Sequence, residues 1–232
     1  MYRIFPKKVV FIFIAWIVIG VYVLFDLLGG VIGSGLRMSA IPAVAWMLTY
    51  ILLLNPVWRF FWKKFPILSK WVFPDLNGKW RVDLYSNWSR QLQLLEAAKS
   101  KTECLDIRGC DESELAELTH KVLEAEISQG WWTFEMKLRN PDNDSPIKKS
   151  LTISIDPFRR EGLRNPGICY IYKQENDTDN VSDDAEFYGA ARLEYDLEQD
   201  KLEGLVWTAR MWKRAMNTAS KAVFTRLPEA SA

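Results

Sequence analysis

The chain has 232 residues, of which 49% are hydrophobic, and its 30 basic and 29 acidic residues nearly cancel. This length allows one large domain or two small ones. The sequence has a single histidine, three cysteines without a CxxC pair, and no P-loop, GxSxG, HExxH or dinucleotide-binding motif, which argues against a metal site and most enzymes. We therefore predict a protein that is not an enzyme and requires no cofactor.

The near-neutral total hides two segments of opposite charge. Eight basic residues and one acid precede Pro74, so this leader has a net charge of +7. The remaining residues carry 22 of the basic and 28 of the acidic side chains, a net charge of −6. We predict an apolar membrane region at residues 1–73 and a water-facing domain at residues 74–232, long enough to bury a core without disulfides.

An apolar segment near the N-terminus predicts a first membrane span. The 17 residues from Val9 to Phe25 carry no charge, and a helix of that length extends for roughly 26 Å, slightly less than a hydrocarbon core. The apolar run continues past Asp26, so we place the span at about 9–28 with Asp26 near the far interface. Asp26 as a functional acid within the membrane is the alternative. We expect the glycine-rich segment 29–35 to be a short loop.

A second charge-free segment, Met38–Trp58, is 21 residues long and predicts a second span at about 38–58. Pro42 fits the first turn of this helix, and Asn55-Pro56 fits its end. Tryptophans and basic residues follow at the exit, as in an interfacial belt. A cleaved signal peptide is the alternative for the first span, but no small-x-small cleavage pattern follows it.

The positions of the basic residues predict the orientation of the two spans. Basic residues flank the outer end of each span, whereas the connecting loop contains only Arg37. The positive-inside rule therefore places both termini of a multi-pass membrane protein in the cytoplasm. The unpaired thiols of Cys104, Cys110 and Cys169 agree, because they fit a reducing compartment.

The segment Phe73–Trp80 joins the membrane region to the second domain. Pro74 prevents a helix from continuing, Asn77-Gly78 provides a turn that tolerates positive φ, and apolar and polar residues alternate from Gly78 onward. We interpret this segment as a hinge between a membrane anchor and a domain built from strands.

Alternation continues through the rest of the chain. The first predicted strand is Gly78–Tyr85; Ser89–Lys99 fits a short helix or a second strand, and the charged stretch Lys99–Glu117 suggests a surface insertion. Seven more predicted strands lie near Thr119–Ser128, Trp131–Arg139, Lys148–Asp156, Gly167–Lys173, Phe187–Asp196, Lys201–Met211 and Thr218–Arg226. We predict a membrane-anchored all-β fold: two N-terminal transmembrane helices and a minimal antiparallel β-barrel of about eight strands.

Aromatic and hydrogen-bonding side chains on these strands indicate a binding site. A barrel of this size is just wide enough for one small ligand, nucleobases stack on aromatic rings, and arginine binds phosphate. We expect Thr208 and Arg210 to point inward beside aromatic rings, because a buried charge needs a partner. The candidate ligand-binding residues are Trp80, Gln129, Trp132, Tyr170, Tyr172, Tyr188, Thr208 and Arg210.

The charge of the domain limits the ligand. A net charge of −6 is wrong for gripping long DNA or RNA, which requires a basic face. A small anion in a pocket needs only one or two basic residues. Two alternatives remain open: a membrane scaffold whose barrel binds a protein partner, and a lipocalin-like carrier of apolar ligands, for which a dry aliphatic interior is expected.

Several short motifs, in this order behind two predicted spans, resemble one known family, the two-transmembrane β-barrel effectors of bacterial CBASS antiphage defence (the SMODS-associating, two-transmembrane, β-strand-rich effectors). The resemblance covers nearly the whole chain. The motifs are Pro74–Trp80, Ile127-Ser128-Gln129, Cys169–Tyr172, Tyr188–Ala191, Leu202-Glu203-Gly204 and Trp207–Arg210. The chain departs from the family at Met211-Trp212-Lys213, where the family favours Thr and Gly, and at the insertion Lys99–Glu117.

The resemblance implies a function. In that family a cytoplasmic barrel binds a cyclic dinucleotide made by a partner CD-NTase, a nucleotidyltransferase, during phage infection. Ligand binding drives homo-oligomerisation, and the membrane segments then disrupt the inner membrane, so that the cell dies before phage mature.

Overall fold

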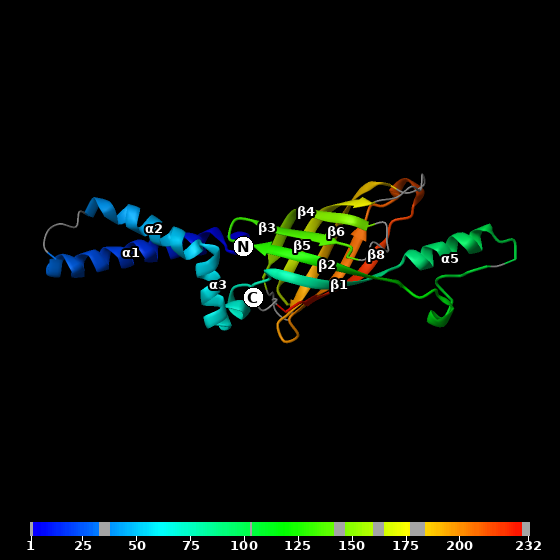
Figure 1. Cartoon of the computed structure of the whole chain (residues 1–232), viewed down its shortest axis with the longest axis horizontal. Helices are drawn as coiled ribbons and strands as arrows, with labels where there is room; N and C mark the ends of the chain where they lie inside the picture. The colour runs from blue at the N-terminus through cyan, green and yellow to red at the C-terminus, as the bar shows by residue number, and fades with distance from the viewer. Residues whose placement is uncertain are drawn as a thin grey trace. The chain divides into compact units, whose positions relative to one another are not determined.

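The computed structural model describes residues 2–32, 38–102, 104–141, 147–159, 165–176 and 184–228. The chain divides into two compact units. The first unit contains Met1–Asp75 with Gly130–Trp132, and the second contains Leu76–Gln129 with Thr133–Ala232. Figure 1 shows that the first unit is built from helices and that the second is a β-barrel.

The first unit contains one helix that is long and apolar enough to cross a membrane. Helix α1 spans Lys7–Ile32 after a short 3-10 helix, Tyr2–Ile4, and its candidate membrane segment is Lys7–Leu27. The expectation of a loop from residue 29 is wrong for residues 29–32, which continue the helix. Residues 33–35 of that expected loop lie outside the described part of the chain.

The second predicted span is divided into two helices. Helix α2 spans Ile41–Leu53 after the 3-10 helix Met38–Ala40, and helix α3 spans Asn55–Lys64. The two axes are bent by 65°, and the pair counts as a second crossing only if both helices form one span. The break has a local cause, because Leu54 is extended and Pro56 lies in the first turn of α3. Asn55-Pro56 thus ends one helix, as predicted, and begins another.

Two sets of contacts hold the helical unit together. Helices α1 and α2 lie side by side in Figure 1, and Val21, Ile41 and Ala45 form the buried cluster between them. In α3, Trp58 is fully buried and meets Trp62 edge to face. The Arg59 guanidinium also donates to the Asp75 carboxylate at 2.9 Å, beyond the short helix α4 (Ile67–Trp71).

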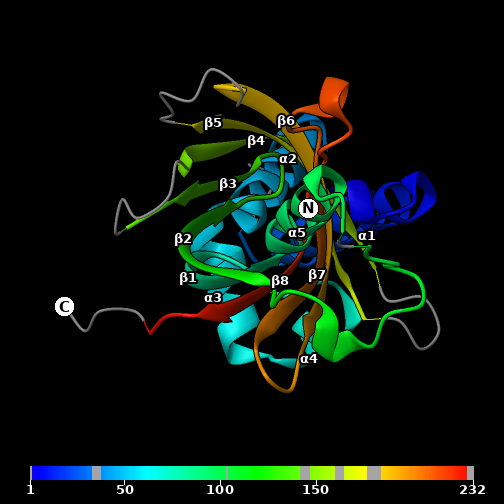
Figure 2. The same ribbon diagram turned by 90° about the vertical axis from the view of Figure 1, so that its right-hand side faces the viewer.

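The second unit is a closed barrel of eight antiparallel strands, as the alternation predicted. Each strand pairs with its neighbours in sequence, and β1 pairs with β8 to close the barrel (Figure 2). The strands are β1 Gly78–Ser86, β2 Thr119–Gln129, β3 Phe134–Arg139, β4 Ile147–Phe158, β5 Gly167–Asn176, β6 Glu186–Asp196, β7 Lys201–Thr208 and β8 Ala219–Arg226. Here the proximal end of the barrel is the end where β1 begins, and the distal end is where β1 finishes.

The hinge sequence fixes the proximal end of β1. Gly78 has a φ of +126°, as the predicted Asn-Gly turn requires. The Asn77 side chain donates to the Gln129 carbonyl at 3.0 Å and accepts the Gln129 N–H at 2.7 Å. The Gln129 side chain in turn accepts the Leu76 N–H at 2.6 Å. These hydrogen bonds tie the start of β1 to the end of β2.

The connection between β1 and β2 contains a helix. Of the two alternatives for Ser89–Lys99 the helix holds, because α5 spans Trp88–Lys99. In the charged stretch that follows, the structure describes a 3-10 helix, Glu112–Glu114. Figures 1 and 2 show α5 projecting from the distal end of the barrel.

Three predicted strand boundaries are wrong by three residues. Strand β5 ends at Asn176 and not at Lys173. Strand β3 begins at Phe134, three residues later than predicted, because Gly130–Trp132 belongs to the helical unit and not to the barrel. Strand β7 ends at Thr208 and not at Met211. Met211 has a left-handed backbone, with a φ of +50°, and the 3-10 helix Trp212–Arg214 follows it. A left-handed residue cannot continue a strand, so Arg210 lies in the β7–β8 loop.

Candidate functional site

The proximal half of the barrel interior is filled by side chains. Trp80 and Phe224 are fully buried there, and Arg226 lies over the Trp80 ring with its guanidinium carbon 4.2 Å from the ring centroid. Arg226 also donates to the Asp200 carboxylate at 2.7 Å. Other buried residues of this layer are Ile127, Met136, Ile168, Leu193 and Leu202. This end of the barrel is a packed core.

A cavity lies further along the interior, with an empty volume of about 410 Å³ that includes space open to solvent. All eleven described residues that line it are uncharged: Val82, Leu84, Leu123, Leu138, Ser150, Tyr170, Tyr172, Gln174, Val206, Ala222 and Phe224. They come from seven of the eight strands, so the whole barrel shapes the cavity.

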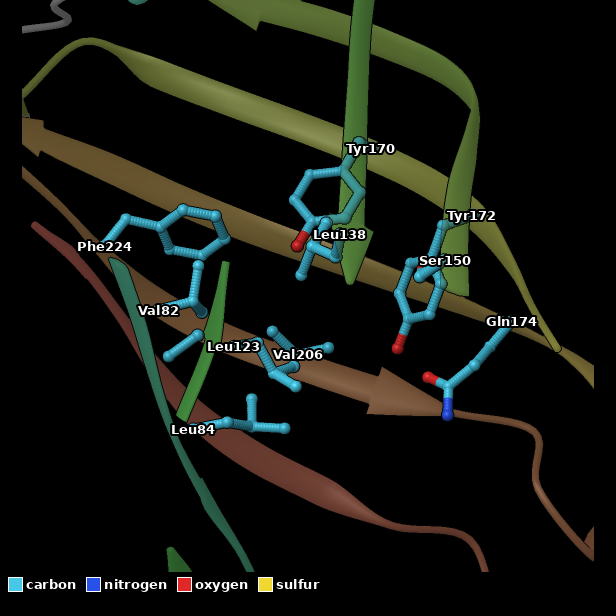
Figure 3. Close-up of a pocket in the computed structure, with 11 residues that line it drawn as sticks. Val82, Leu84, Leu123, Leu138, Ser150, Tyr170, Tyr172, Gln174, Val206 and Phe224 are labelled. Atoms are coloured by element: carbon cyan, nitrogen blue, oxygen red, sulfur yellow. The ribbon is translucent and has the colours of Figure 1, made fainter. Parts of the chain in front are cut away.

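The polar side chains of the lining lie on one side of the cavity. Figure 3 shows Tyr170, Tyr172 and Gln174 following one another along β5, with Ser150 of β4 beside them. Aliphatic side chains of β1, β2 and β7 face them. The cavity therefore has an aromatic and hydrogen-bonding wall opposite an aliphatic wall.

The two tyrosines of this wall are buried and neutral. Their ring centroids are 5.7 Å apart, and the planes are tilted by 46°. Burial raises the pKa of the Tyr170 phenol, with a smaller contribution from Tyr172, and burial raises the pKa of Tyr172 as well. Both hydroxyls therefore stay protonated at physiological pH, and each can donate or accept a hydrogen bond.

Glycine on the neighbouring strand makes room for Tyr172. Gly189 of β6 pairs with Tyr172, and a Cβ atom at Gly189 would lie 2.3 Å from the tyrosine ring. Real Cβ atoms do not come so close, so any larger residue would displace the ring. Gly189 also pairs with Thr208, the last residue of β7. Strand β6 is thus the one strand between the polar wall on β5 and the strand that leads into the β7–β8 loop.

That loop carries Arg210, two residues after the end of β7. The Thr208 hydroxyl is 2.7 Å from the Thr218 hydroxyl and accepts the Arg210 N–H at 3.4 Å. The Arg210 guanidinium carbon lies 4.8 Å from the centroid of Trp88, the first residue of α5. Arg210 is partly exposed, so it offers a positive charge at the rim and not inside the cavity.

The structure brings together only part of the predicted site. Tyr170 and Tyr172 line the cavity, while Thr208 and Arg210 lie at the distal rim. The expectation that Arg210 points into the barrel is wrong, because the strand ends two residues earlier.

The other four predicted residues lie elsewhere. Trp80 is buried in the proximal core, where its indole N–H donates to the Leu76 carbonyl at 3.0 Å, and the Gln129 side chain binds the hinge. Tyr188 is 58% exposed on the outside of β6, and Trp132 belongs to the helical unit. None of these four side chains is among the described residues that line the cavity.

Sequence reasoning missed Ser150, Gln174 and Trp88. Gln174 follows Tyr170 and Tyr172 at the same two-residue spacing, so a longer β5 would have placed it on the same face. Ser150 and Trp88 had no comparable signal, because their roles depend on β4 register and on the start of α5. In the described ranges, no group of three or more His, Cys, Asp or Glu side chains is placed to hold a metal ion.

The comparisons with known proteins add a distant relative. No family model matches the chain. Over 188 residues the chain is 25% identical to CD-NTase-associated protein 15 of Escherichia albertii, an alignment that covers 79% of this chain and 80% of that protein. The alignment is long enough to indicate distant homology over most of both chains.

Proposed function

We propose that this protein is a CBASS effector that binds a cyclic dinucleotide in its β-barrel and then disrupts the bacterial inner membrane. It acts without catalysis: the barrel detects the product of a CD-NTase, and the helices cause the damage. The observation that carries the proposal is the cavity, in which two tyrosines tilted against each other and an amide face an interior that is otherwise mostly apolar. The relationship to a CD-NTase-associated protein supports it.

The distribution of polarity suggests how such a ligand is held. A nucleobase is a flat ring with hydrogen-bonding edges, and it suits the wall made by Tyr170, Tyr172 and Gln174. The phosphates carry full charges, which are costly to bury beside uncharged side chains. They therefore remain at the distal rim, where Arg210 provides a guanidinium. The base enters the barrel, and the phosphate ring stays outside.

The helical unit has a feature that suits membrane disruption. Helix α2 has 13 residues and is roughly 20 Å long, whereas a hydrocarbon core is ~30 Å thick. Helix α1 has 26 residues and is long enough. A short helix beside a long one thins the bilayer locally or tilts its partner, at a cost that grows with each ångström of mismatch. Oligomerisation would bring many α1–α2 pairs together, and their combined effect would weaken the bilayer.

An apolar band on the outside of the barrel offers a surface for the self-association of the chain. Ile171, Ala190 and Trp207 pair across β5, β6 and β7, so they form a row on the outer face. Ile171 is 49% exposed and Trp207 is 48% exposed. Tyr188 and Leu205 extend the band on the same strands. Large exposed apolar patches commonly mark interfaces, and we assign this band to contact between copies of the chain after ligand binding.

One observation favours a second candidate, a carrier of apolar ligands. Seven of the eleven lining residues are aliphatic or phenylalanine, and none is charged. An apolar ligand would make no hydrogen bond with the hydroxyls and the amide of this wall, which is why we rank this function second.

Reconstitution in lipid vesicles tests the proposed function. The full chain is inserted into dye-loaded vesicles of bacterial lipids, and a 3′,3′-linked cyclic dinucleotide or a long-chain fatty acid is added. We expect rapid dye release with the cyclic dinucleotide alone. Release that does not depend on the nucleotide would contradict ligand control, and release triggered by the fatty acid would favour the apolar carrier.

A further inference from the structure

Two amide side chains occupy inward positions where β5 reaches the distal end. Gln174 is 8% exposed and Asn176 is 9% exposed, so both are more than nine-tenths buried. They continue the inward row of Tyr170 and Tyr172 on the same strand. Buried amides reduce stability unless their donors and acceptors are hydrogen-bonded.

The hydrogen bonds of this pair are incomplete. The Gln174 Nε2 donates to the Asn176 Oδ1 at 2.8 Å, which satisfies one donor and one acceptor. The Asn176 Nδ2 is buried and has no hydrogen-bond partner among the residues that the structure describes. Figure 3 shows the Gln174 amide beside the Tyr172 ring, on the polar wall of the cavity. The pair thus offers hydrogen-bonding groups next to an aromatic face.

We propose that Gln174 and Asn176 bind the edge of a nucleobase, and that this base is adenine. The inference rests on the proposed function, because it identifies the base of the same cyclic dinucleotide. Adenine presents its N6 amine beside the N7 acceptor, and the side-chain amides of asparagine and glutamine match this pattern. The base stacks on Tyr172 and brings its edge to the amide pair.

Guanine fits this wall less well. Its N7 and O6 are adjacent acceptors that require two donors, a role usually filled by arginine or lysine, and the lining is uncharged. Guanine also carries an exocyclic amine, N2, that adenine lacks and that would be buried. The facing wall contains Val82, Leu84 and Val206, whose side chains offer that amine no acceptor.

A ligand series tests the inference on the unaltered protein. The full chain in lipid nanodiscs is titrated by calorimetry with 3′,3′-linked cyclic di-adenosine, di-inosine and di-guanosine monophosphates. Inosine replaces the N6 amine of adenine with an oxygen, and guanosine adds the N2 amine. We expect the adenosine ligand to bind more tightly than either of the others, by roughly 5- to 100-fold.

The outcomes separate this inference from the proposed function. Equal affinity for the three ligands, or tighter binding of the guanosine ligand, would overturn the assignment of adenine and leave the proposed function standing. Binding of none of the three would overturn both.

A matched pair of variants tests the residues themselves. Asn176→Asp keeps the shape and the Oδ1 that accepts from Gln174, but it replaces the remaining donor with an acceptor. We expect the preference for adenosine over guanosine to disappear. The control is Glu175→Gln, whose side chain pairs with Lys149 on the outer face, 3.0 Å away, and should leave the preference unchanged.

Thermal unfolding of each variant shows whether the barrel remains folded. If the buried carboxylate unfolds it, Asn176→Ala removes the same donor without adding charge or another donor. An unchanged preference for adenosine in a folded variant of Asn176 would overturn its role.

Discussion

The ring of Tyr172 lies directly against the backbone of Gly189 on the neighbouring strand, so that a Cβ atom there would come within 2.3 Å of the ring. The glycine thereby determines where the main aromatic surface of the cavity lies. Replacing Gly189 with alanine should displace the Tyr172 ring and destabilise the barrel by about 1–3 kcal/mol, the usual cost of overpacking. Chemical denaturation measures the free energy of unfolding, and ligand titration should show weakened binding.

A second substitution checks that the clash is with the ring. In a Tyr172→Leu background, Gly189→Ala meets a smaller and more flexible side chain, so its cost should fall well below the cost in the unaltered protein. An equal cost in both backgrounds would show that the alanine disturbs the strand itself.

Arg210 at the distal rim provides the charge that we assign to the phosphates. Arg210→Ala should weaken cyclic dinucleotide binding by roughly 10-fold or more, because charge-assisted hydrogen bonds are among the strongest polar contacts. The matched control is Arg214→Ala, which removes an exposed arginine from the same loop. Calorimetric titration of both variants gives the affinities. Equal affinities in the two variants would remove Arg210 from the site.

The outer band of β5, β6 and β7 should control assembly without affecting ligand affinity. Trp207→Lys places a charge in the middle of this band, so that burial against a second copy becomes unfavourable. Sedimentation velocity in detergent should show ligand-dependent oligomers for the unaltered chain and their loss in Trp207→Lys. The control is Trp212→Lys, which alters an exposed tryptophan outside the band. Unchanged assembly in Trp207→Lys would assign oligomerisation to another surface.

The contact between α1 and α2 should control membrane damage. Ala45 is 4% exposed within the cluster that it forms with Val21 and Ile41. Ala45→Leu is too large for this contact and should separate the helices, since close helix packing in membranes depends on small residues. Dye release from vesicles should fall while ligand affinity is retained. Met47→Leu, at a position 54% exposed, serves as the control; loss of release in both variants would contradict a specific role for the contact.

Alternation predicted most of the barrel because nearly every strand is apolar on one side only. Seven of the eight predicted strand starts lie within one residue of the observed start, and Gly78 shows the positive φ that its turn sequence indicated. Alternation does not reveal a β-bulge, after which the inward-facing positions change from even to odd residue numbers or the reverse. In β4 the register shifts between Thr152 and Ser154. Ser150 and Ile155 are therefore both buried, although they are five positions apart and would lie on opposite faces of a regular strand.

The candidate site was less predictable for a related reason. Arg210 was assigned to a strand because alternation continues to Met211, but the left-handed backbone at Met211 ends the pairing at Thr208. Trp80 and Gln129 carry the aromatic and amide groups expected of a nucleotide site, yet local hydrogen bonds to Leu76 occupy them. Residue type and strand face were visible in the sequence, whereas depth along the barrel axis was not.

The central claim is that the cavity beside Tyr172 binds a cyclic dinucleotide, and two tyrosine variants test it most directly. Tyr172 lines the cavity, whereas Tyr188 lies on the outer face of the next strand. Calorimetric titration of the full chain in nanodiscs with 3′,3′-linked cyclic di-adenosine monophosphate should show saturable binding of one ligand per chain. Tyr172→Leu should weaken binding by roughly 5- to 100-fold, the usual contribution of a stacked base, and Tyr188→Leu should leave it unchanged. No binding by the unaltered chain, or equal affinity in the two variants, would contradict the claim.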